Sequence, residues 1–221
     1  MPHTVLAFHG YSLNAEQMAE SLEPLERALA PGLKIVCLNG PHVCSSESVD
    51  RLYATLGGVR RTPPHLCWWD ATEHGEVYRG WEETCASVRE AIEHYAPVSV
   101  LGFSQGAILA AAIAGLAALG ELPRVQSAVL VAGRTPRAAA LAHAFLEPVR
   151  LPSLHVWGER DERAGPLAQE LSAHFDEASR ETVIWRGGHL LPNRGPAFEA
   201  MVRFLTEQIR RQPGGDWVTK V

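Results

Sequence analysis

Three polar side chains, each in a glycine-containing turn, are of the types that nucleophilic catalysis needs. Ser104 lies in the motif Gly-Phe-Ser-Gln-Gly at 102–106, Asp161 follows Gly158 by three positions, and His189 follows a Gly-Gly pair. A serine is a weak nucleophile at neutral pH, so a histidine must take its proton and a carboxylate must hold that imidazole in the right tautomer. Their order along the chain, Ser, Asp, His, is that of α/β-hydrolase triads. We therefore predict acyl transfer, with Ser104 as nucleophile, His189 as base and Asp161 as its orienting carboxylate.

Two of these assignments have rivals in the sequence. Glu159 and Glu162 share an acidic turn with Asp161, and any one of the three could be a solvated surface charge. We choose Asp161, because a strand end, a glycine, two residues and then Asp is the usual placement on such a fold. His9 rivals His189, since it also follows a predicted strand. A histidine in a His-Gly pair at that place more often braces the oxyanion loop.

The surroundings of Ser104 predict a nucleophile elbow, a sharp turn between a strand and a helix. A mostly β-branched apolar run at 98–101 precedes it, and an alanine-rich segment follows it as far as Gly120. Such a turn forces the serine to positive φ and leaves room only for glycine two residues to either side. It would lift the serine hydroxyl above the sheet and aim the first helical N–H groups, beginning at Gln105, at an oxyanion.

Predicted strands and helices alternate along the chain. The strands are expected at 4–8, 34–38, 98–101, 127–131, 154–157 and 182–185, and the helices at about 14–29, 81–95, 107–119, 166–175 and 196–212. This alternation is typical of a parallel sheet covered on both faces, with ligand sites at the carboxyl ends of its strands. The predicted fold class is α/β, an α/β-hydrolase fold with a mostly parallel central sheet of about six strands and helices on both faces.

The sequence indicates one α/β-hydrolase domain at 1–212, followed by a flexible tail at 213–221 that begins with Pro-Gly-Gly. Residues 39–80 show little periodicity and form an irregular insertion near the active site. Trp68 and Trp69 argue against disorder there, because disordered segments are poor in large aromatic residues. Asn14 and Gln17 predict a capping box at the start of the first helix.

Composition excludes several classes of protein. The chain has 221 residues, 46% of them hydrophobic, which suffices for one full core. Its net charge of −5, with no lysine-rich run, lacks the footprint of a nucleic-acid-binding protein. The longest apolar stretch, at 107–119, is shorter than a membrane span, and no signal peptide is evident, so we expect a cytoplasmic protein. The four cysteines lack zinc-type or Cys-x-x-Cys spacing, which favours reduced thiols and predicts no metal site.

Five stretches together resemble the FSH-type serine hydrolase family, typified by the yeast FSH proteins and the human ovarian-cancer-associated gene 2 product and related to the fungal polyketide-releasing thioesterases. They are Phe-His-Gly-Tyr-Ser-Leu-Asn at 8–14, Trp-Trp at 68–69 followed by Tyr-Arg-Gly at 78–80, Gly-Phe-Ser-Gln-Gly-Ala at 102–107, Leu-His-Val-Trp-Gly-Glu-Arg-Asp at 154–161 and Gly-Gly-His-Leu-Leu-Pro at 187–192. The resemblance implies a triad of Ser104, Asp161 and His189. It also implies an oxyanion hole made of the backbone N–H groups of Tyr11 and Gln105.

The leading functional prediction is a serine hydrolase that cleaves small or acyl esters through an acyl-enzyme and needs no cofactor. Trp68, Trp69, Tyr78 and Leu190 are candidates for an apolar acyl pocket, although ordinary core packing explains aromatic residues equally well. An alternative is an acyl thioesterase that acts on carrier- or coenzyme A-bound chains. Four arginines of the insertion, Arg51, Arg60, Arg61 and Arg79, could then meet a phosphate. A second alternative is a non-catalytic binding protein on the same fold.

Overall fold

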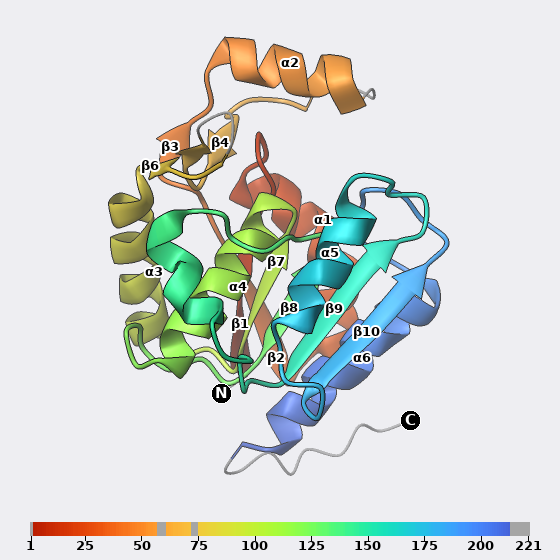
Figure 1. The fold of residues 1–221 in the computed structure, drawn as a ribbon. Helices are drawn as coiled ribbons and strands as arrows, with labels where there is room; N and C mark the ends of the chain where they lie inside the picture. Colours follow the sequence, from red (N-terminus) through yellow and green to blue (C-terminus); the bar gives the residue numbers. More distant parts are fainter. Residues whose placement is uncertain (1, 57–60, 72–74, 213–221) are drawn as a thin grey trace.

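A single parallel sheet forms the centre of the molecule (Figure 1). The computed structural model describes residues 2–56, 61–71 and 75–212. The strands are β1 (His3–Phe8), β2 (Leu33–Leu38), β7 (Ser99–Phe103), β8 (Ala128–Val131), β9 (Ser153–Gly158) and β10 (Arg180–Trp185), in the order β10-β9-β8-β7-β1-β2. All adjacent pairs are parallel. The α/β fold predicted from the alternation of strands and helices is confirmed.

The strand order reverses beside β1, and this reversal creates the place for a site. The chain passes from β1 to β2 on one side, and then returns to add β7, β8, β9 and β10 on the other side. The connections that leave the carboxyl ends of β1 and β7 therefore diverge, and a crevice opens between them. The loop at 9–14 and the elbow at Ser104 lie at this crevice.

Two hydrophobic cores cover the two faces of the sheet. Alternate side chains of a strand point to opposite faces, so Val5 and Ala7 join one core and Leu6 and Phe8 the other. Helices α1 (Ala15–Leu29) and α6 (Gly195–Arg210) pack on the first face, while α3 (Trp81–Tyr95), α4 (Gln105–Ala118), α5 (Ala164–Ala173) and the 3-10 helix η1 (Ala139–Phe145) cover the second (Figure 1).

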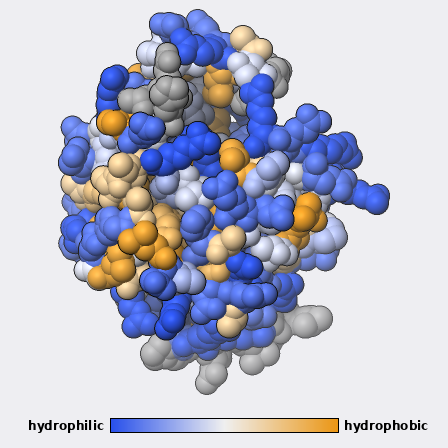
Figure 2. Space-filling view, viewed as in Figure 1, coloured by the Kyte–Doolittle hydropathy of each residue, from blue (hydrophilic) through white to orange (hydrophobic). Residues whose placement is uncertain are grey.

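Helix α4, the helix of the predicted elbow, lies at the centre of the second core. Its residues from Gln105 to Leu116 are all buried, because α3, η1 and the sheet surround it. This explains why its sequence is apolar on every side and carries no charge. The outer surface of this face is mostly hydrophilic, and hydrophobic side chains gather mainly over η1 (Figure 2). None of the helices in the described ranges is long and apolar enough to cross a bilayer.

The start of α1 corrects one prediction. Asn14 caps the helix as expected, since its Oδ1 accepts a hydrogen bond from the Gln17 N–H at 3.0 Å. The Gln17 side chain does not complete a capping box. Its Nε2 donates instead to the Thr62 carbonyl at 2.8 Å, and the Asn14 Nδ2 donates to the Pro64 carbonyl at 3.0 Å. Both amides therefore anchor the middle of the insertion to α1.

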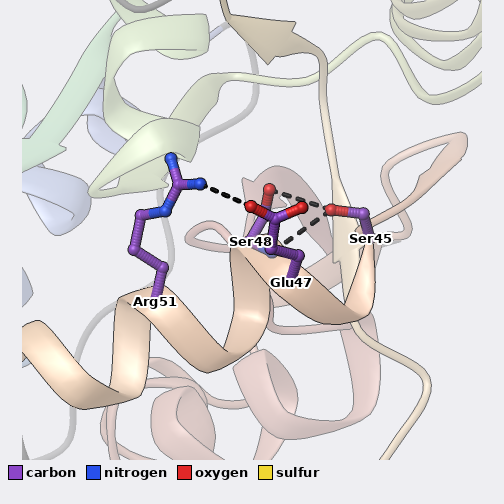
Figure 3. A network of polar contacts seen from close by, with 4 residues as sticks. All are labelled: Ser45, Glu47, Ser48 and Arg51. Carbon is purple, nitrogen blue, oxygen red and sulfur yellow. Dashed lines mark hydrogen bonds and ion pairs between the residues drawn. The ribbon is translucent and has the colours of Figure 1, made fainter.

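The insertion at 39–80 is more regular than predicted. It contains helix α2 (Ser46–Leu56) and the short strands β3 (His42–Val43), β4 (Leu66–Cys67), β5 (Asp70–Ala71) and β6 (Tyr78–Arg79). Ser45 explains where α2 begins, because its Oγ accepts a hydrogen bond from the Ser48 N–H at 3.2 Å (Figure 3). One turn on, Arg51 forms an ion pair with Glu47 (Figure 3). The predicted tail at 213–221 lies outside the described residues.

Candidate active site

Ser104 occupies a strained turn between β7 and α4. Its backbone has φ 54° and ψ −115°, which is unusual for a residue other than glycine. A Cβ at position 102 would lie 2.1 Å from the Gly106 carbonyl oxygen, and a Cβ at position 106 would lie 2.0 Å from that of Phe8. Only glycine fits at these two places, so the motif predicted the local backbone for a physical reason.

His189 lies between Ser104 and Asp161 and contacts both. Its Nε2 is 3.0 Å from the Ser104 Oγ, and its Nδ1 is 2.6 Å from the Asp161 Oδ2. The carboxylate needs a hydrogen on Nδ1, so Nε2 is the nitrogen left to accept the serine proton. The ring also packs against Phe103, with ring centroids 5.1 Å apart. Three residues that are 28 and 85 positions apart in sequence thus form one continuous hydrogen-bond chain.

Asp161 is the carboxylate that the fold directs inward. It is buried, and its other oxygen accepts a hydrogen bond from the Ala164 N–H at the start of α5. Glu159 and Glu162, its rivals in the sequence, are exposed. Hydrogen bonds from the Glu159 and Arg160 N–H groups to the Trp185 and Gly187 carbonyls join this turn to the turn that carries His189. The two turns therefore hold each other in place.

Two backbone N–H groups beside Ser104 have no acceptor among the residues that the structure describes. They belong to Tyr11, in the loop after β1, and Gln105, the first residue of α4. These are the two groups that the family resemblance implies as oxyanion donors. Burial raises the pKa of the Tyr11 hydroxyl above its ordinary value, while a hydrogen bond with Ser48 lowers it. The Tyr11 side chain thereby contacts α2.

His9 has a bracing position and is not a free base. Its Nε2 accepts a hydrogen bond from the Gly40 N–H at 2.9 Å, so Nδ1 carries the proton and donates to the Gly10 carbonyl at 2.8 Å. Burial lowers the pKa of this imidazole to about 4, which keeps it neutral. His9 thus joins the loop at 9–14 to the start of the insertion.

The side chain of Gln105 holds the insertion against the elbow, a role that the sequence reading missed. Its Oε1 accepts a hydrogen bond from the Trp68 N–H at 3.1 Å, and its Nε2 donates to the Trp69 carbonyl at 2.9 Å. The Trp68 indole N–H donates to the His9 carbonyl at 2.8 Å. The sequence signal at this contact was the Gln-Gly pair after the serine. That pair does not show that the Gln105 side chain reaches Trp69, 36 residues away.

Two pockets open at Ser104, and each is also lined by Tyr11 and His189. The apolar pocket, of about 310 Å³, lies between α1, α2 and the turn after β10, and includes Leu13, Met18, Leu52, Phe103, Leu190 and Leu191. The arginine pocket, of about 410 Å³, lies beside the loops after β8 and β9, and includes Trp69, Asp70, Ile108, Arg134, Arg163 and Leu167.

The residues predicted to line an acyl pocket divide between these places. Leu190 lines the apolar pocket and is 59% exposed, while Trp69 lines the arginine pocket. Trp68 is fully buried against Phe8 and His9, and Tyr78 is buried in a stack on Trp69. Neither Trp68 nor Tyr78 is among the residues that line the two pockets. Both have the core-packing role that was the alternative for these aromatics.

The four arginines of the insertion do not form one cluster beside Ser104. Arg61 lines the apolar pocket, Arg79 lines a separate cavity with Glu83, and Arg51 is paired with Glu47. Arg60 lies outside the described residues. Within 2–56, 61–71 and 75–212, no group of three or more His, Cys, Asp or Glu side chains is placed to hold a metal ion.

A model of the family described as serine hydrolase (FSH1) matches residues 1–201. The chain belongs to the FSH1 serine hydrolase family. Human esterase OVCA2 is 30% identical over 220 residues, which cover 93% of this chain and 96% of the human protein. The Drosophila melanogaster esterase CG5412 is 27% identical and is covered over 74% of its length. Membership of the FSH1 family, predicted from the five motifs, is confirmed.

Solved structures with this fold have low sequence identity to this chain. The structure of esterase PE8 superposes with a TM-score of 0.65 at 18% identity, covering 94% of this chain and 96% of its own. The Arabidopsis thaliana protein SOBER1 also superposes with a TM-score of 0.65, at 14% identity and 95% coverage of this chain. Similarity at this level shows the α/β-hydrolase fold alone.

Proposed function

We propose that this protein hydrolyses carboxylic esters through an acyl-enzyme formed on Ser104. The hydrogen-bond chain from Asp161 through His189 to Ser104 is the observation that carries the proposal. As the serine oxygen attacks the ester carbonyl carbon, its proton passes to the His189 Nε2, and the carboxylate of Asp161 stabilises the imidazolium. The same proton then goes to the leaving alcohol. Water attacks the acyl-enzyme in a second step and releases the acid.

The negative charge of each tetrahedral intermediate requires hydrogen-bond donors that are in place beforehand. The N–H groups of Tyr11 and Gln105 are suited to this role, because they flank Ser104 and have no acceptor in the described part of the chain. The positive end of the α4 dipole adds to the effect at Gln105. The names of the esterases OVCA2 and CG5412 support the ester as the substrate class.

A fluorophosphonate probe tests the proposal directly. We expect it to label the protein once, with the adduct on Ser104 by peptide mass spectrometry, and we expect turnover of 4-nitrophenyl butyrate. Ser104→Ala should abolish both, whereas Ser87→Ala, at an exposed serine of α3, should retain both. Label on another residue, or turnover by a folded Ser104→Ala protein, would refute the assignment. A protein that is never labelled and never turns over would be a binding protein.

An acyl thioesterase is a second candidate function, favoured by Arg61 in the apolar pocket beside Ser104. A guanidinium group there could bind a phosphate of a coenzyme A or carrier-bound substrate. The esterase and the thioesterase are distinguished by comparing kcat/KM for the butyryl and decanoyl esters of 4-nitrophenol with kcat/KM for the matching coenzyme A thioesters. Thioesterase function predicts a preference for the coenzyme A substrates that Arg61→Gln reduces.

The cysteines support a reducing location such as the cytoplasm. Cys37, Cys44, Cys67 and Cys85 are all free thiols. Burial raises the pKa of Cys37 to about 12 and that of Cys85 to about 11, which keeps both as unreactive thiols. Fractionation of cells followed by detection of the native protein would test this location.

A further inference from the structure

The arginine pocket carries positive charge that the described protein does not neutralise. Arg134 follows β8 and is half-buried, and Arg163 stands directly before α5. Neither guanidinium group forms an ion pair with an acidic side chain in the described ranges. Asp70 lies at the same pocket, but it is exposed and pairs with neither arginine. A half-buried arginine without a carboxylate partner is costly for stability, so its presence beside a nucleophile calls for a ligand.

The surroundings of Arg134 make an anion more favourable beside it than beside a fully solvated surface arginine. Burial lowers the pKa of Arg134, and the positive charge of Arg137 lowers it further. Tyr78, whose hydroxyl accepts a hydrogen bond from the Arg137 N–H, and Gly75 also lie close to Arg134. The opposite charge of an anion in this pocket would therefore offset the cost of burial and repulsion at Arg134.

The apolar pocket on the other side of Ser104 differs in holding one arginine where the arginine pocket holds two. Its walls are mainly leucine, methionine and aromatic side chains, with Arg61 at one position. A substrate whose ester carbonyl lies at Ser104 would extend one half into each pocket. We propose that the arginine pocket binds an anionic group, a carboxylate or phosphate, at one end of an ester whose other half is apolar. This specificity rests on the proposed ester hydrolysis for its reaction, but the binding of the anion does not depend on turnover.

Two pairs of esters test the specificity and locate the charge. In the first pair the acyl half ends in a carboxylate or an amide, as in 4-nitrophenyl hydrogen adipate and 4-nitrophenyl adipamate. In the second pair the alcohol half does so, as in the butyrate esters of glycolic acid and glycolamide. We expect the carboxylate to be preferred in kcat/KM on the order of 10- to 100-fold in one pair, mainly through a lower KM, since hydrogen bonds to charged groups are the stronger ones.

Arginine variants connect this preference to the pocket. The ratio of carboxylate to amide ester should fall toward one in Arg134→Gln and in Arg163→Gln, and Arg134→Lys should retain part of it. Arg150→Gln is the matched control, because Arg150 is exposed before β9, at the opposite end of the sheet. A ratio near one for both ester pairs in the unmodified protein, or a ratio that neither Arg134→Gln nor Arg163→Gln changes, would overturn the inference.

A binding measurement keeps the inference separate from the proposed function. Adipate, the product of the first ester, should raise the melting temperature of the Ser104→Ala protein, while adipamide should not. The shift should disappear in Ser104→Ala/Arg163→Gln, whose second change is at an exposed position and leaves the fold intact. Adipate binding without ester turnover would support the pocket and contradict the esterase. Ester turnover without adipate binding or carboxylate preference would support the esterase and contradict the anion-binding pocket.

Discussion

The turns that carry the reacting groups and the insertion at 39–80 are held in place by different interactions. Backbone hydrogen bonds between neighbouring turns fix Ser104 and Asp161, such as those from the Ser104 N–H to Val131 and from the Glu159 N–H to Trp185. Side chains from distant parts of the chain hold the insertion, namely Asn14, Gln17, His9 and Gln105. The chemistry thus depends on the sheet, whereas the walls of the pockets depend on a few polar side chains.

The largest expected effect comes from a change in a turn at the carboxyl end of the sheet, outside the insertion. Asp161→Asn should leave the fold intact and lower kcat by a factor on the order of 10³–10⁴, because an amide holds the His189 imidazole in the wrong tautomer. Kinetics with 4-nitrophenyl butyrate and a thermal unfolding curve measure the two effects. Glu159→Gln and Glu162→Gln are the controls and should cost little, since both side chains are exposed. A large loss in either control, with Asp161→Asn active, would reassign the carboxylate.

The second prediction concerns how the stability of the two regions depends on pH. Burial lowers the pKa of His9 to about 4 and that of His155 in β9 to about 3, so both are neutral in the folded state. Below pH 6.5, the ordinary pKa of histidine, the unfolded chain binds protons that the folded chain does not. Stability should therefore be complete above pH 6.5 and fall as the pH drops toward 4, by on the order of 3 kcal/mol for each histidine.

Urea unfolding between pH 4.5 and pH 7.5 measures this slope. His155→Leu should flatten it by about half, because it removes one of the two histidines whose pKa is lowered. The imidazole it removes has no partner for Nδ1 among the described residues and bonds only the Ser153 hydroxyl through Nε2, at 3.1 Å. The remaining half belongs to His9, at the contact between the sheet and the insertion. His94→Gln, at an exposed position of α3, should leave the slope unchanged. An unchanged slope in His155→Leu would show that other groups cause the acid sensitivity.

The sequence predicted the sheet and the reacting groups because their signals are local. A strand followed by Gly-x-Ser-x-Gly and an alanine-rich helix contains within itself the reason for the turn at Ser104. Helix α2 was missed although Val49, Leu52, Tyr53 and Leu56 stand at helical spacing, because its short segment was taken together with the irregular, glycine- and proline-containing residues that follow it. The burial of Trp68 could not be predicted either. It depends on a hydrogen bond to His9, 59 residues away, and no property of Trp68 or its neighbours encodes that distance.

The third prediction weakens the attachment of the insertion without altering the triad. Gln105→Ala keeps the backbone N–H of residue 105 but leaves the Trp68 N–H and the Trp69 carbonyl buried without partners. This should cost about 2 kcal/mol of unfolding free energy and lower kcat/KM about tenfold, since the walls of the arginine pocket lose their support. Gln169→Ala, at an exposed glutamine of α5, is the control. A fully stable and fully active Gln105→Ala protein would show that the insertion is held by its hydrophobic contacts.

The smallest expected effect tests the apolar pocket. Leu190 is 59% exposed, so Leu190→Ala should change stability by less than about 0.5 kcal/mol. A long apolar chain in the pocket would bury the Leu190 side chain, and the loss of that contact should lower kcat/KM a few-fold for decanoate esters and leave acetate esters unchanged. The matched control is Leu119→Ala, because Leu119 is 53% exposed just after α4 and lines neither pocket. An equal loss for acetate and decanoate esters would mean that Leu190 acts by positioning His189, its neighbour in the same turn, and that the apolar half of the substrate binds elsewhere.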